Sequence, residues 1–337
     1  MTAVQVLFRV EASEILGLGH LSRCRSLALE LARRFLCSPI FATIQTKTAK
    51  SFLDGLGVTI IHPDQLSGKH EFDVAITDIP GLCLNEQRWL GELASLHVGI
   101  NDDDPGPFAY DILIRPNLLD LPIPATEKKT CDYWKGREYI ILHPDFALRR
   151  PSSAGRLKVE NMLVCFGGSD PAGLTLRVIP ILAQVVQDVN VHIVLGSAFT
   201  GKEAVSALIA AMPNVSLTVN CSTIAEALSR ADVALISGGT LMYEACVLGV
   251  PTLVLCQNEP QHQEAEILAG GGAVINLGMH SQVNDERIVS AIKIMLGDTA
   301  QRQRLSVTAR RLVPSNGTSH IGSKIARRLA WNQALKR

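Results

Sequence analysis

Short aliphatic runs alternate with amphipathic, helix-like segments along the whole of this 337-residue sequence. Apolar runs of about four to eight residues that end at turn-forming residues predict buried strands, and strands separated by helices predict a parallel sheet. The composition agrees, because 47% of the residues are hydrophobic but only 5% are aromatic. Parallel sheets covered by helices on both faces have such aliphatic cores. The expected fold class is therefore α/β, with doubly wound, Rossmann-like sheets.

Each half of the sequence contains its own set of these elements. The expected strands cover residues 4–10, 39–45, 58–62, 72–78, 96–101, 111–115, 161–166, 190–195, 215–219, 232–236, 251–256 and 273–276. The expected helices cover residues 20–35, 171–188, 201–212, 222–231, 239–249, 260–270, 284–297 and 318–335. Because single cores rarely grow beyond about 250 to 300 residues, two domains are expected.

The segment "ALRRPSSAGRLKVEN" (147–161) is polar and rich in turn-forming residues, so it is the expected linker. We therefore expect a first domain over residues 1–148 and a second over 156–317, with a final helix over 318–337 that can pack back on the first domain. Two such domains would face each other across a cleft. Ligands of open α/β sheets bind at the loops that leave the carboxyl ends of the strands.

Charge and cysteine usage exclude several classes of function. Lys plus Arg and Asp plus Glu both number 32, so nothing indicates nucleic acid or an anionic membrane as a partner. No secretory signal pattern and no run of about 18 apolar residues is present, so no membrane insertion is expected. The eight cysteines never form a C-x-x-C pair, which is typical of reduced thiols rather than disulfides or a zinc site. A cytoplasmic protein is expected.

The first candidate loop contains Gly17-Leu18-Gly19-His20 and leads into a helix. A dinucleotide fingerprint needs a third glycine where this sequence has Ser22, so simple NAD binding is disfavoured. The glycines permit a sharp bend or close approach to a ligand. His20 lies near the positive end of the helix dipole, which favours the neutral ring that a general base requires. The alternative is a histidine that only bonds nearby backbone.

The second candidate loop is "FGGSDPAGLT", in which a buried strand runs into Gly167, Gly168, Ser169 and Asp170. Ser169 or Asp170 can cap the following helix, and Pro171 suits its first turn. Free amides at a helix start form an anion site, and the glycines would let a phosphate come close. No G-K-[ST] follows, so this is not a Walker A loop. A capped turn without any ligand remains the alternative.

The third candidate loop is "SGGTLMYEACVLGVP", with Gly238-Gly239-Thr240 at a helix start and Glu244 one turn further on. Glu244 could accept hydrogen bonds from a pair of ribose hydroxyls. A carboxylate among apolar neighbours usually has a partner, although a solvated helix residue is the alternative. Further polar candidates follow the next strand, at Asn258 and Gln261.

Taken together, these motifs resemble a known family. They are G-x-G-H-x-x-R-C at 17–24, "YIILHPDFALRR", "FGGSDPAGLT", "SGGTLMYEACVLGVP" and "GAVINLG", and they extend over nearly the whole chain. The sequence resembles the glycosyltransferase-B superfamily, in the branch of the lipid II-forming N-acetylglucosaminyltransferase. Within it, the sequence is most similar to the UDP-sugar hydrolase of pseudaminic acid biosynthesis and its spore-coat-polysaccharide relatives.

The resemblance implies metal-independent hydrolysis of a UDP-linked amino-deoxy sugar to free sugar and UDP, without a cofactor. His20 would be the base that activates water, and Gly167, Gly168, Ser169 and Glu244 would bind UDP. The N-terminal domain would hold the sugar. The expected partners are the UDP-sugar itself and, in addition, other enzymes of the same sugar pathway.

One segment departs from the family. Where those hydrolases have an Asp pair followed by an Arg and a His, this chain has "NDDDPGPFAYDILIRPN", without the His. Asp102 and Asp103 would border the sugar, together with Gly17, Gly19 and Arg23. A D-x-D run can also bind a divalent metal in other glycosyltransferases, but a solvated or sugar-binding turn is favoured and no metal is expected. Two further readings stay open: a transferase that uses the same UDP-sugar, and a non-catalytic nucleotide-sugar-binding protein.

Overall fold

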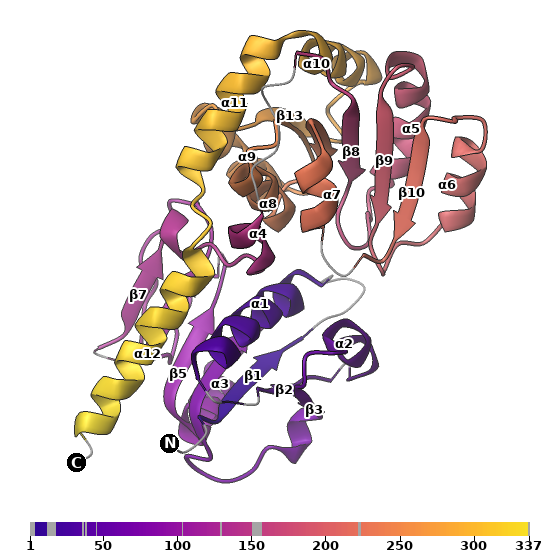
Figure 1. The fold of residues 1–337 in the computed structure, drawn as a ribbon. Coiled ribbons are helices and arrows are strands. Elements are labelled where there is room, and N and C mark those ends of the chain that lie inside the picture. The colour runs from indigo at the N-terminus through magenta and orange to yellow at the C-terminus, as the bar shows by residue number, and fades with distance from the viewer. Residues whose placement is uncertain are drawn as a thin grey trace. The chain divides into compact units, whose positions relative to one another are not determined.

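The computed structural model describes residues 4–11, 18–35, 37, 39–44, 46–102, 104–128, 130–149, 157–221 and 224–335. Gly17 and Asp103, which the sequence predicts as substrate contacts, lie outside the described residues. The chain divides into two compact units (Figure 1). The first unit comprises Met1–Pro144 and Asn316–Arg337, and the second comprises Asp145–Ser315.

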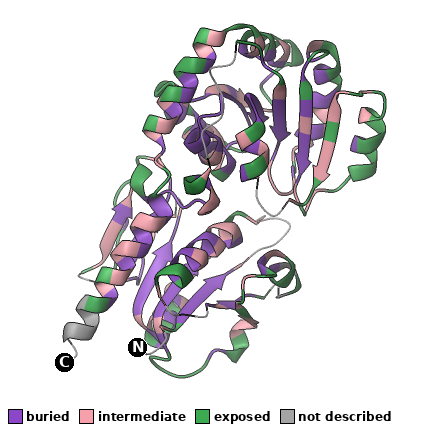
Figure 2. Cartoon of the chain, in the orientation of Figure 1, coloured by how far each residue is buried: buried purple, intermediate pink, exposed green. Residues whose placement is uncertain are grey.

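The first unit is built on a seven-stranded, all-parallel sheet with the strand order β3-β2-β1-β4-β5-β6-β7. The strands are β1 (Val6–Val10), β2 (Ile40–Ala42), β3 (Thr59–Ile61), β4 (Phe72–Asp78), β5 (Ala94–Ile100), β6 (Ile112–Arg115) and β7 (Asp132–Lys135). The helices of this unit are α1 (Gly19–Arg34), α2 (Thr46–Leu53), α3 (Leu84–Leu93) and α12 (Gly317–Leu335), with short 3-10 turns η1 (Pro63–Gln65) and η2 (Arg137–Tyr139). Figure 2 shows the central strands buried beneath helices whose outer faces are exposed.

The last helix of the chain belongs to the first unit. Helix α12 packs against α1, where Gly322 leaves so little room that an added Cβ would lie 3.0 Å from the Cγ atom of Glu30 and the Nε atom of Arg34. Arg34 also donates to the main-chain oxygen of Ser319 over 2.9 Å. The chain therefore returns to its first sheet after completing the second unit.

The second unit contains a six-stranded parallel sheet with the order β10-β9-β8-β11-β12-β13. Its strands are β8 (Asn161–Cys165), β9 (Asn190–Leu195), β10 (Val215–Val219), β11 (Val233–Ile236), β12 (Thr252–Cys256) and β13 (Ile275–Met279). Its helices are α4 (Asp145–Leu148), α5 (Leu174–Val185), α6 (Lys202–Ile209), α7 (Ala225–Arg230), α8 (Thr240–Leu248), α9 (Glu259–Gly270), α10 (Asp285–Gly297) and α11 (Thr299–Leu312). The core is aliphatic, as the composition predicts.

The differences from the sequence prediction have local causes. Strand β7 reads "DYWK" and is only partly buried, so it has no aliphatic run to reveal it. Helices α2, α3 and α11 are also missing from the prediction, and α11 has the lowest mean apolar content of these, with four Arg and Gln residues in "AQRQR". Helix α5 begins at Leu174 rather than at 171, because Asp170 and Gly173 both have positive φ angles that a helix cannot include.

Each sheet has one position where the order of the strands reverses its direction. In the first unit this switch point lies between β1 and β4, where Val10 pairs with Asp78. In the second unit it lies between β8 and β11, where Cys165 pairs with Ile236. In open α/β sheets, ligands commonly bind at the carboxyl ends of the strands at such a switch point. Three of these four strands precede a loop that the sequence predicts as functional.

Arg302 on α11 links this helix to the end of α10 and to Leu157 by hydrogen bonds. Its side chain is buried, and its guanidinium donates to the main-chain oxygens of Met295, Leu296 and Leu157, each over 2.9 Å. The first two of these carbonyls belong to the last turn of α10, where helical partners are missing. One buried cation thus satisfies several acceptors that would otherwise lose hydration without compensation.

We predict that Arg302→Gln lowers the free energy of unfolding by about 2 kcal/mol or more, since hydrogen bonds to charged groups contribute roughly 1.5 to 3 kcal/mol. Thermal unfolding monitored by circular dichroism measures this effect. Arg304→Gln is the matched control, because Arg304 lies on the same helix but is exposed. Equal melting temperatures for the two variants would contradict the assigned role of Arg302.

Candidate functional site

His20 is the second residue of α1. Of the loop that precedes this helix, Leu18 is described. The residue before the helix, Leu18, provides no side-chain cap, and the first turn contains no acidic residue. The side chain of His20 is 15% exposed. It is therefore positioned by surrounding protein but still accessible to a small molecule.

The imidazole of His20 contacts the last residue of the neighbouring strand. Its Nδ1 atom lies 2.8 Å from Oδ1 of Asp78, which closes β4 and is 1% exposed. The helix α1 follows β1, and β1 pairs with β4, so the topology brings these two residues together. Asp78 is not among the residues predicted from the sequence, although an acidic residue at the end of a buried strand at the switch point is a recognisable signal.

Asp78 is ionised despite its burial. Burial alone would raise the pKa of Asp78, but the charge and hydrogen bonds of Arg23, together with His20, lower it to about 2. Arg23 donates from Nε to Oδ2 over 2.5 Å and from one terminal nitrogen to Oδ1 over 2.7 Å. This bidentate pairing matches the planar geometry of guanidinium and carboxylate.

The protonation of Asp78 assigns the tautomer of His20. An ionised carboxylate has only acceptor sites, so a 2.8 Å contact requires that the proton be on Nδ1 of the imidazole. In the neutral ring, Nε2 is then the unprotonated nitrogen. Because a carboxylate oriented in this way also stabilises the imidazolium that forms on proton uptake, the pair is suited to general base catalysis.

Arg23 and Asp102 complete this cluster. Besides Asp78, Arg23 donates to Oδ1 of Asp102 over 2.6 Å, while the Asp102 side chain remains 38% exposed. Asp102 follows β5, and its main-chain oxygen accepts a 2.9 Å hydrogen bond from Asn117. Both Arg23 and Asp102 are predicted from the sequence to bind substrate. In the structure the donors of Arg23 are directed at the two carboxylates, and the more exposed Asp102 is the better placed to meet a ligand.

Asp104, the last residue of the acidic segment, is held by two hydrogen bonds. Asp104 accepts a 3.0 Å hydrogen bond from the amide of Gly106 through its side chain, and a 2.6 Å bond from Arg115 through its main-chain oxygen. Arg115 is itself buried. Within the residues that the structure describes, no group of three His, Cys, Asp or Glu side chains is arranged to hold a metal ion. Asp103 is not among those residues.

In the second unit, the loop after β8 bends at Gly167, whose φ of +86° favours glycine. Asp170 is buried, and its two carboxylate oxygens accept from the amides of Leu174 (2.9 Å) and Thr175 (2.7 Å). Asp170 thus caps α5, as one of the two residues proposed for that role. The capping also corrects the expected anion site, because the first amides of α5 are already paired with this carboxylate and are not free for a phosphate.

Neighbouring loops pack tightly around these glycines. A Cβ atom on Gly196, the residue after β9, would lie 2.3 Å from the Cα atom of Gly168. Gln257, after β12, donates to the main-chain oxygen of Phe166 over 2.8 Å. Neither Gly196 nor the bridging role of Gln257 is predicted from the sequence, since neither residue lies in a glycine pair. Ser169 lies within the same turn, between Gly168 and Asp170.

The loop after β11 enters α8 without a cap. Gly239 precedes the helix with φ +83° and ψ −154°, and this N-cap residue makes no side-chain hydrogen bond to the first turn at Thr240. A Cβ atom on Gly238 would lie 2.7 Å from Cβ of Gln261, so this position requires close approach to α9. Uncapped amides at a helix start provide a positive region for an anion. This helix start, rather than that of α5, fits the predicted phosphate site.

Asn258 and Gln261 build the start of α9. The side chain of Asn258 accepts from the amide of Gln261 over 3.0 Å, and the Gln261 side chain accepts from the amide of Gln257 over 3.0 Å. Asn258 therefore acts as an N-cap. Gln261 lies directly against Gly238, and Asn258 is joined to it by the hydrogen bond to Gln261. These hydrogen bonds lie within the protein and are explained without a ligand.

Glu244 is half-buried on α8 and, among the described residues, has no hydrogen-bond or salt-bridge partner. Burial raises the pKa of Glu244 to about 8. Its charge also contributes, after burial, to the raised pKa values of the Cys165 and Cys221 thiols, so Glu244 lies near the end of β8 and the segment that follows β10. A carboxyl group held in this way, without a protein partner, is a candidate for ligand recognition.

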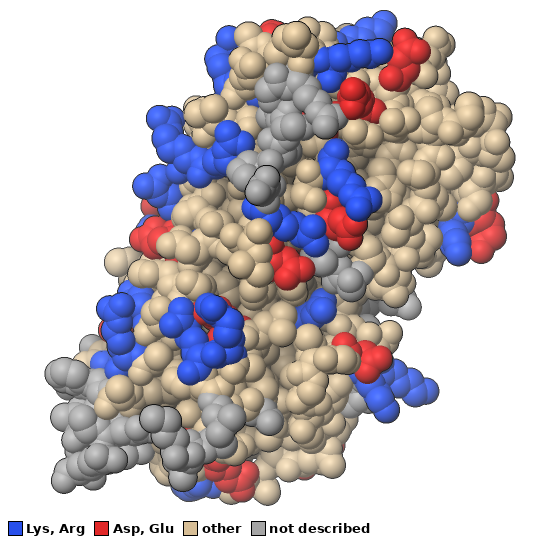
Figure 3. Space-filling model, viewed as in Figure 1, with Lys and Arg blue, Asp and Glu red and all other residues tan. Residues whose placement is uncertain are grey.

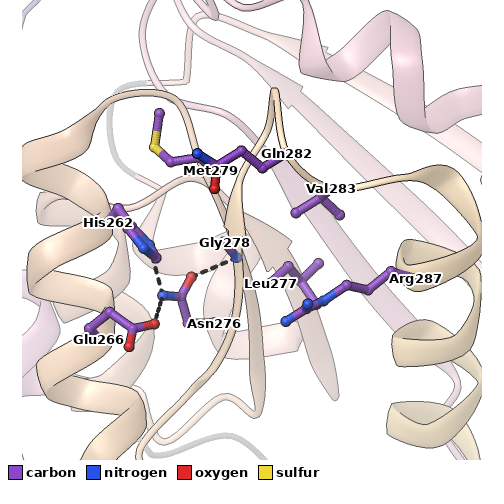
Figure 4. A pocket seen from close by; sticks show the side chains of 9 residues that line it. All are labelled: His262, Glu266, Asn276, Leu277, Gly278, Met279, Gln282, Val283 and Arg287. Carbon is purple, nitrogen blue, oxygen red and sulfur yellow. Dashed lines mark hydrogen bonds between the residues drawn. The ribbon is translucent and has the colours of Figure 1, made fainter.

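A separate polar pocket of about 240 Å³ lies between α9, β13 and α10 (Figure 4). Its wall includes Asn276, whose side-chain nitrogen contacts His262 (3.1 Å) and Glu266 (2.5 Å), and whose oxygen accepts from Gly278 (3.0 Å). Arg287 approaches from the opposite side. These contacts explain the polar lining as an internal network.

The surface carries charges of both signs. On the face in Figure 3, Lys and Arg side chains lie among Asp and Glu side chains, with uncharged areas between them, which agrees with the equal numbers in the sequence. None of the helices in the described part of the chain has the length and apolar character that a membrane span requires. All eight cysteines are unpaired.

This architecture of two parallel-sheet α/β units is the glycosyltransferase-B fold. The crystal structure of MurG from Acinetobacter baumannii matches it with a TM-score of 0.64, covering 96% of this chain and 99% of that chain at 17% identity. The calicheamicin glycosyltransferase CalG4 matches with a TM-score of 0.62 over 98% of this chain and 99% of that chain, at 15% identity. The expected fold class is thus confirmed.

Sequence comparison identifies particular relatives, and no protein-family model matches the chain. The chain is 29% identical over 319 residues to the spore coat polysaccharide biosynthesis protein SpsG of Bacillus subtilis (strain 168), covering 90% of this chain and 93% of that protein. It is 22% identical over 279 residues to the UDP-2,4-diacetamido-2,4,6-trideoxy-beta-L-altropyranose hydrolase of Campylobacter jejuni subsp. jejuni, covering 80% of this chain and 97% of that protein. The resemblance inferred from the motifs is confirmed at this level of similarity.

The raised pKa of Glu244 predicts a specific dependence of stability on pH. The folded protein keeps this proton up to about pH 8, whereas the unfolded chain loses it near its ordinary value of 4.5. Stability is therefore lost as the pH rises from 4.5 to 8. Glu244→Gln should be more stable than the wild type at pH 8, and the two should be equally stable near pH 4.

Melting temperatures across this pH range measure the difference. Glu203→Gln is the control, because Glu203 also lies in the second unit but is exposed on α6. A Glu244→Gln protein that is less stable than the wild type at pH 8 would mean that the carboxylate has a stabilising partner.

Proposed function

We propose that this protein acts on a nucleotide sugar in polysaccharide biosynthesis, and that it hydrolyses a UDP-linked amino-deoxy sugar to free sugar and UDP. The observation that carries the proposal is the pair of His20 and ionised Asp78 at the switch point of the first sheet, with Nε2 of His20 unprotonated in the neutral ring. The fold and the two sequence relatives support the substrate class, since one relative is a polysaccharide biosynthesis protein and the other a UDP-sugar hydrolase.

The second unit is proposed to bind UDP. The uncapped start of α8 offers amides to the diphosphate, and the bend at Gly167 and Gly168 keeps side chains away from it. Glu244 is proposed to accept hydrogen bonds from the ribose hydroxyls. Those bonds would supply the partners that this carboxyl group lacks within the described chain, and they would favour its ionised form.

The first unit is proposed to supply the base. As a water molecule attacks the anomeric carbon, one of its protons passes to Nε2 of His20. The bond between the anomeric carbon and the UDP oxygen breaks, and its electron pair leaves with UDP. Asp78 stays ionised and stabilises the imidazolium, in the way that carboxylates support histidine bases elsewhere. Amides at the start of α8 would stabilise the charge that develops on the leaving group.

A transferase with the same UDP-sugar is the second candidate. The solved structures that share this fold include glycosyltransferases, and a His–Asp pair can deprotonate an acceptor hydroxyl as well as water. A non-catalytic binding protein is disfavoured, because nucleotide binding gives no reason to retain the buried His20–Asp78 pair. Release of UDP without any acceptor separates hydrolysis from transfer.

The test is to incubate the protein with a panel of UDP-linked amino sugars, without acceptor, and to measure UDP. We expect release that survives saturating EDTA with less than about a twofold change, and that falls by about 10²- to 10⁴-fold in His20→Asn, the usual contribution of a general base. UDP affinity should be nearly unchanged in that variant. Release only in the presence of an added acceptor would replace hydrolysis by transfer, and a loss restored by a divalent metal would contradict the metal-independent reaction.

UDP affinity tests the role of Glu244 separately from catalysis. Titration calorimetry should show that Glu244→Ala weakens UDP binding by about 1.5 to 3 kcal/mol, the scale of hydrogen bonds to a charged group. Binding should also release protons between pH 6 and 8, because ribose hydroxyls favour the ionised carboxylate. Glu203→Ala is the control for a surface charge of the same unit. Unchanged affinity in Glu244→Ala would remove this residue from the site.

A further inference from the structure

Arg23 lies against both members of the His20–Asp78 pair. One terminal nitrogen donates to Oδ1 of Asp78 over 2.7 Å and lies 3.0 Å from Nδ1 of His20. The His20 Nδ1 atom approaches the same carboxylate oxygen over 2.8 Å. Two donors therefore converge on one oxygen of Asp78, and one of them is permanently charged.

We propose that Arg23 is a positioning residue that keeps His20 neutral and thus able to accept a proton on Nε2. The guanidinium does this in two ways: it balances the negative charge of Asp78, and it disfavours a second positive charge beside it. This inference rests on the proposed role of His20 as the base. It differs from the substrate contact that the sequence suggests for Arg23, because it assigns the residue to proton chemistry.

The burial of Asp78 makes its charge depend on the cations around it. With Arg23 present, the bidentate contact balances the buried carboxylate, and an imidazolium would place a second cation 3.0 Å from the guanidinium nitrogen. Without Arg23, the carboxylate, which is 1% exposed, would retain His20 as its nearest cationic partner. A buried carboxylate without a counter-ion is costly, so His20 would be held as the imidazolium and would lose its function as a base.

Other titratable groups near the pair do not replace Arg23. Cys24 of α1 donates weakly to Asp78 (3.7 Å), and burial, followed by the charge of Asp78, raises the pKa of its thiol so that it stays protonated. Tyr110, ahead of β6, stays neutral because burial, with Asp78 as a smaller cause, raises the pKa of its hydroxyl. Asp102, after β5, is an anion that pairs with Arg23 itself.

Nitrogen-15 NMR of histidine-labelled protein tests the inference directly, because the chemical shifts of Nδ1 and Nε2 distinguish both neutral tautomers from the imidazolium. The His20→Asn spectrum assigns the His20 signals. In the wild type at pH 7.5 we expect a neutral ring with the proton on Nδ1. In Arg23→Gln the midpoint of His20 protonation should move upward by about one to three pH units, the usual effect of a nearby opposite charge.

Two further variants test whether the loss of any positive charge on α1 shifts the His20 midpoint. Arg33→Gln, on the exposed side of the same helix, should leave the His20 midpoint unchanged, since Arg33 pairs with Glu30. The double variant Arg23→Gln/Asp78→Asn removes both buried charges and should restore a neutral His20 at pH 7.5. An unchanged midpoint in Arg23→Gln, or a wild-type ring with its proton on Nε2, would overturn the inference.

A second comparison remains if Arg23→Gln does not fold. Asp78→Asn and the double variant both lack the buried carboxylate and differ only in Arg23. The double variant should protonate His20 at a higher pH than Asp78→Asn, and equal midpoints would overturn the inference. None of these measurements needs turnover, so inert UDP-sugars would reject the proposed hydrolysis without affecting this result. With an active substrate, Arg23→Gln should move the acidic limb of the rate profile upward by the shift seen in NMR.

Discussion

Parallel pairing of the two central strands in each sheet decides where the polar groups of the candidate site lie. In a parallel sheet every strand ends at the same edge, so β1 and β4 deliver the residues that follow them to one place. This is why His20, at the start of the helix after β1, meets Asp78, the last residue of β4. The equivalent pairing of β8 with β11 brings the Gly167 and Gly238 loops to one edge of the second sheet. The aliphatic cores of the two units fix the strands and therefore the positions of these loops.

Each unit contains a carboxyl group whose pKa is shifted by its surroundings, and the two shifts have opposite directions. In the first, Arg23 and His20 lower the pKa of Asp78 to about 2 against the effect of burial, so the charge is part of a completed network. In the second, burial raises the pKa of Glu244 to about 8, and no hydrogen bond or salt bridge within the described chain offsets this effect. Groups whose environments move their pKa values apart commonly have different roles. Asp78 fits a permanent anion that orients a base, and Glu244 fits a group whose partner arrives with the ligand.

The sequence was sufficient to predict the elements with strong aliphatic or glycine signals. The strands other than β7 and the turns at the glycine pairs belong to this class, because each depends on residues that are close together in the chain. The partner of His20 could not be predicted in the same way, since 58 positions separate it from Asp78 and only the strand order brings them together. Asp170 shows a related limit. An Asp before a helix predicts a cap, but only the structure shows that its carboxylate occupies the amides that a phosphate would need.

Asp102, which follows β5, belongs to the same charged network as Arg23 and Asp78. The main-chain oxygen of Asp102 accepts a hydrogen bond from Asn117, and that of Asp104 accepts one from Arg115, so both residues are held by side chains of the same unit. Such preorganisation keeps the partly exposed carboxylate of Asp102 in contact with Arg23. Any sugar group that binds Asp102 would therefore act on Arg23, which also balances Asp78. Substitutions at Asp102 and His20 belong to one charged network, and their effects on turnover should not add as those of independent sites do. The proposed sugar contact at Asp102 and the proposed proton transfer at His20 would then be coupled through the guanidinium of Arg23.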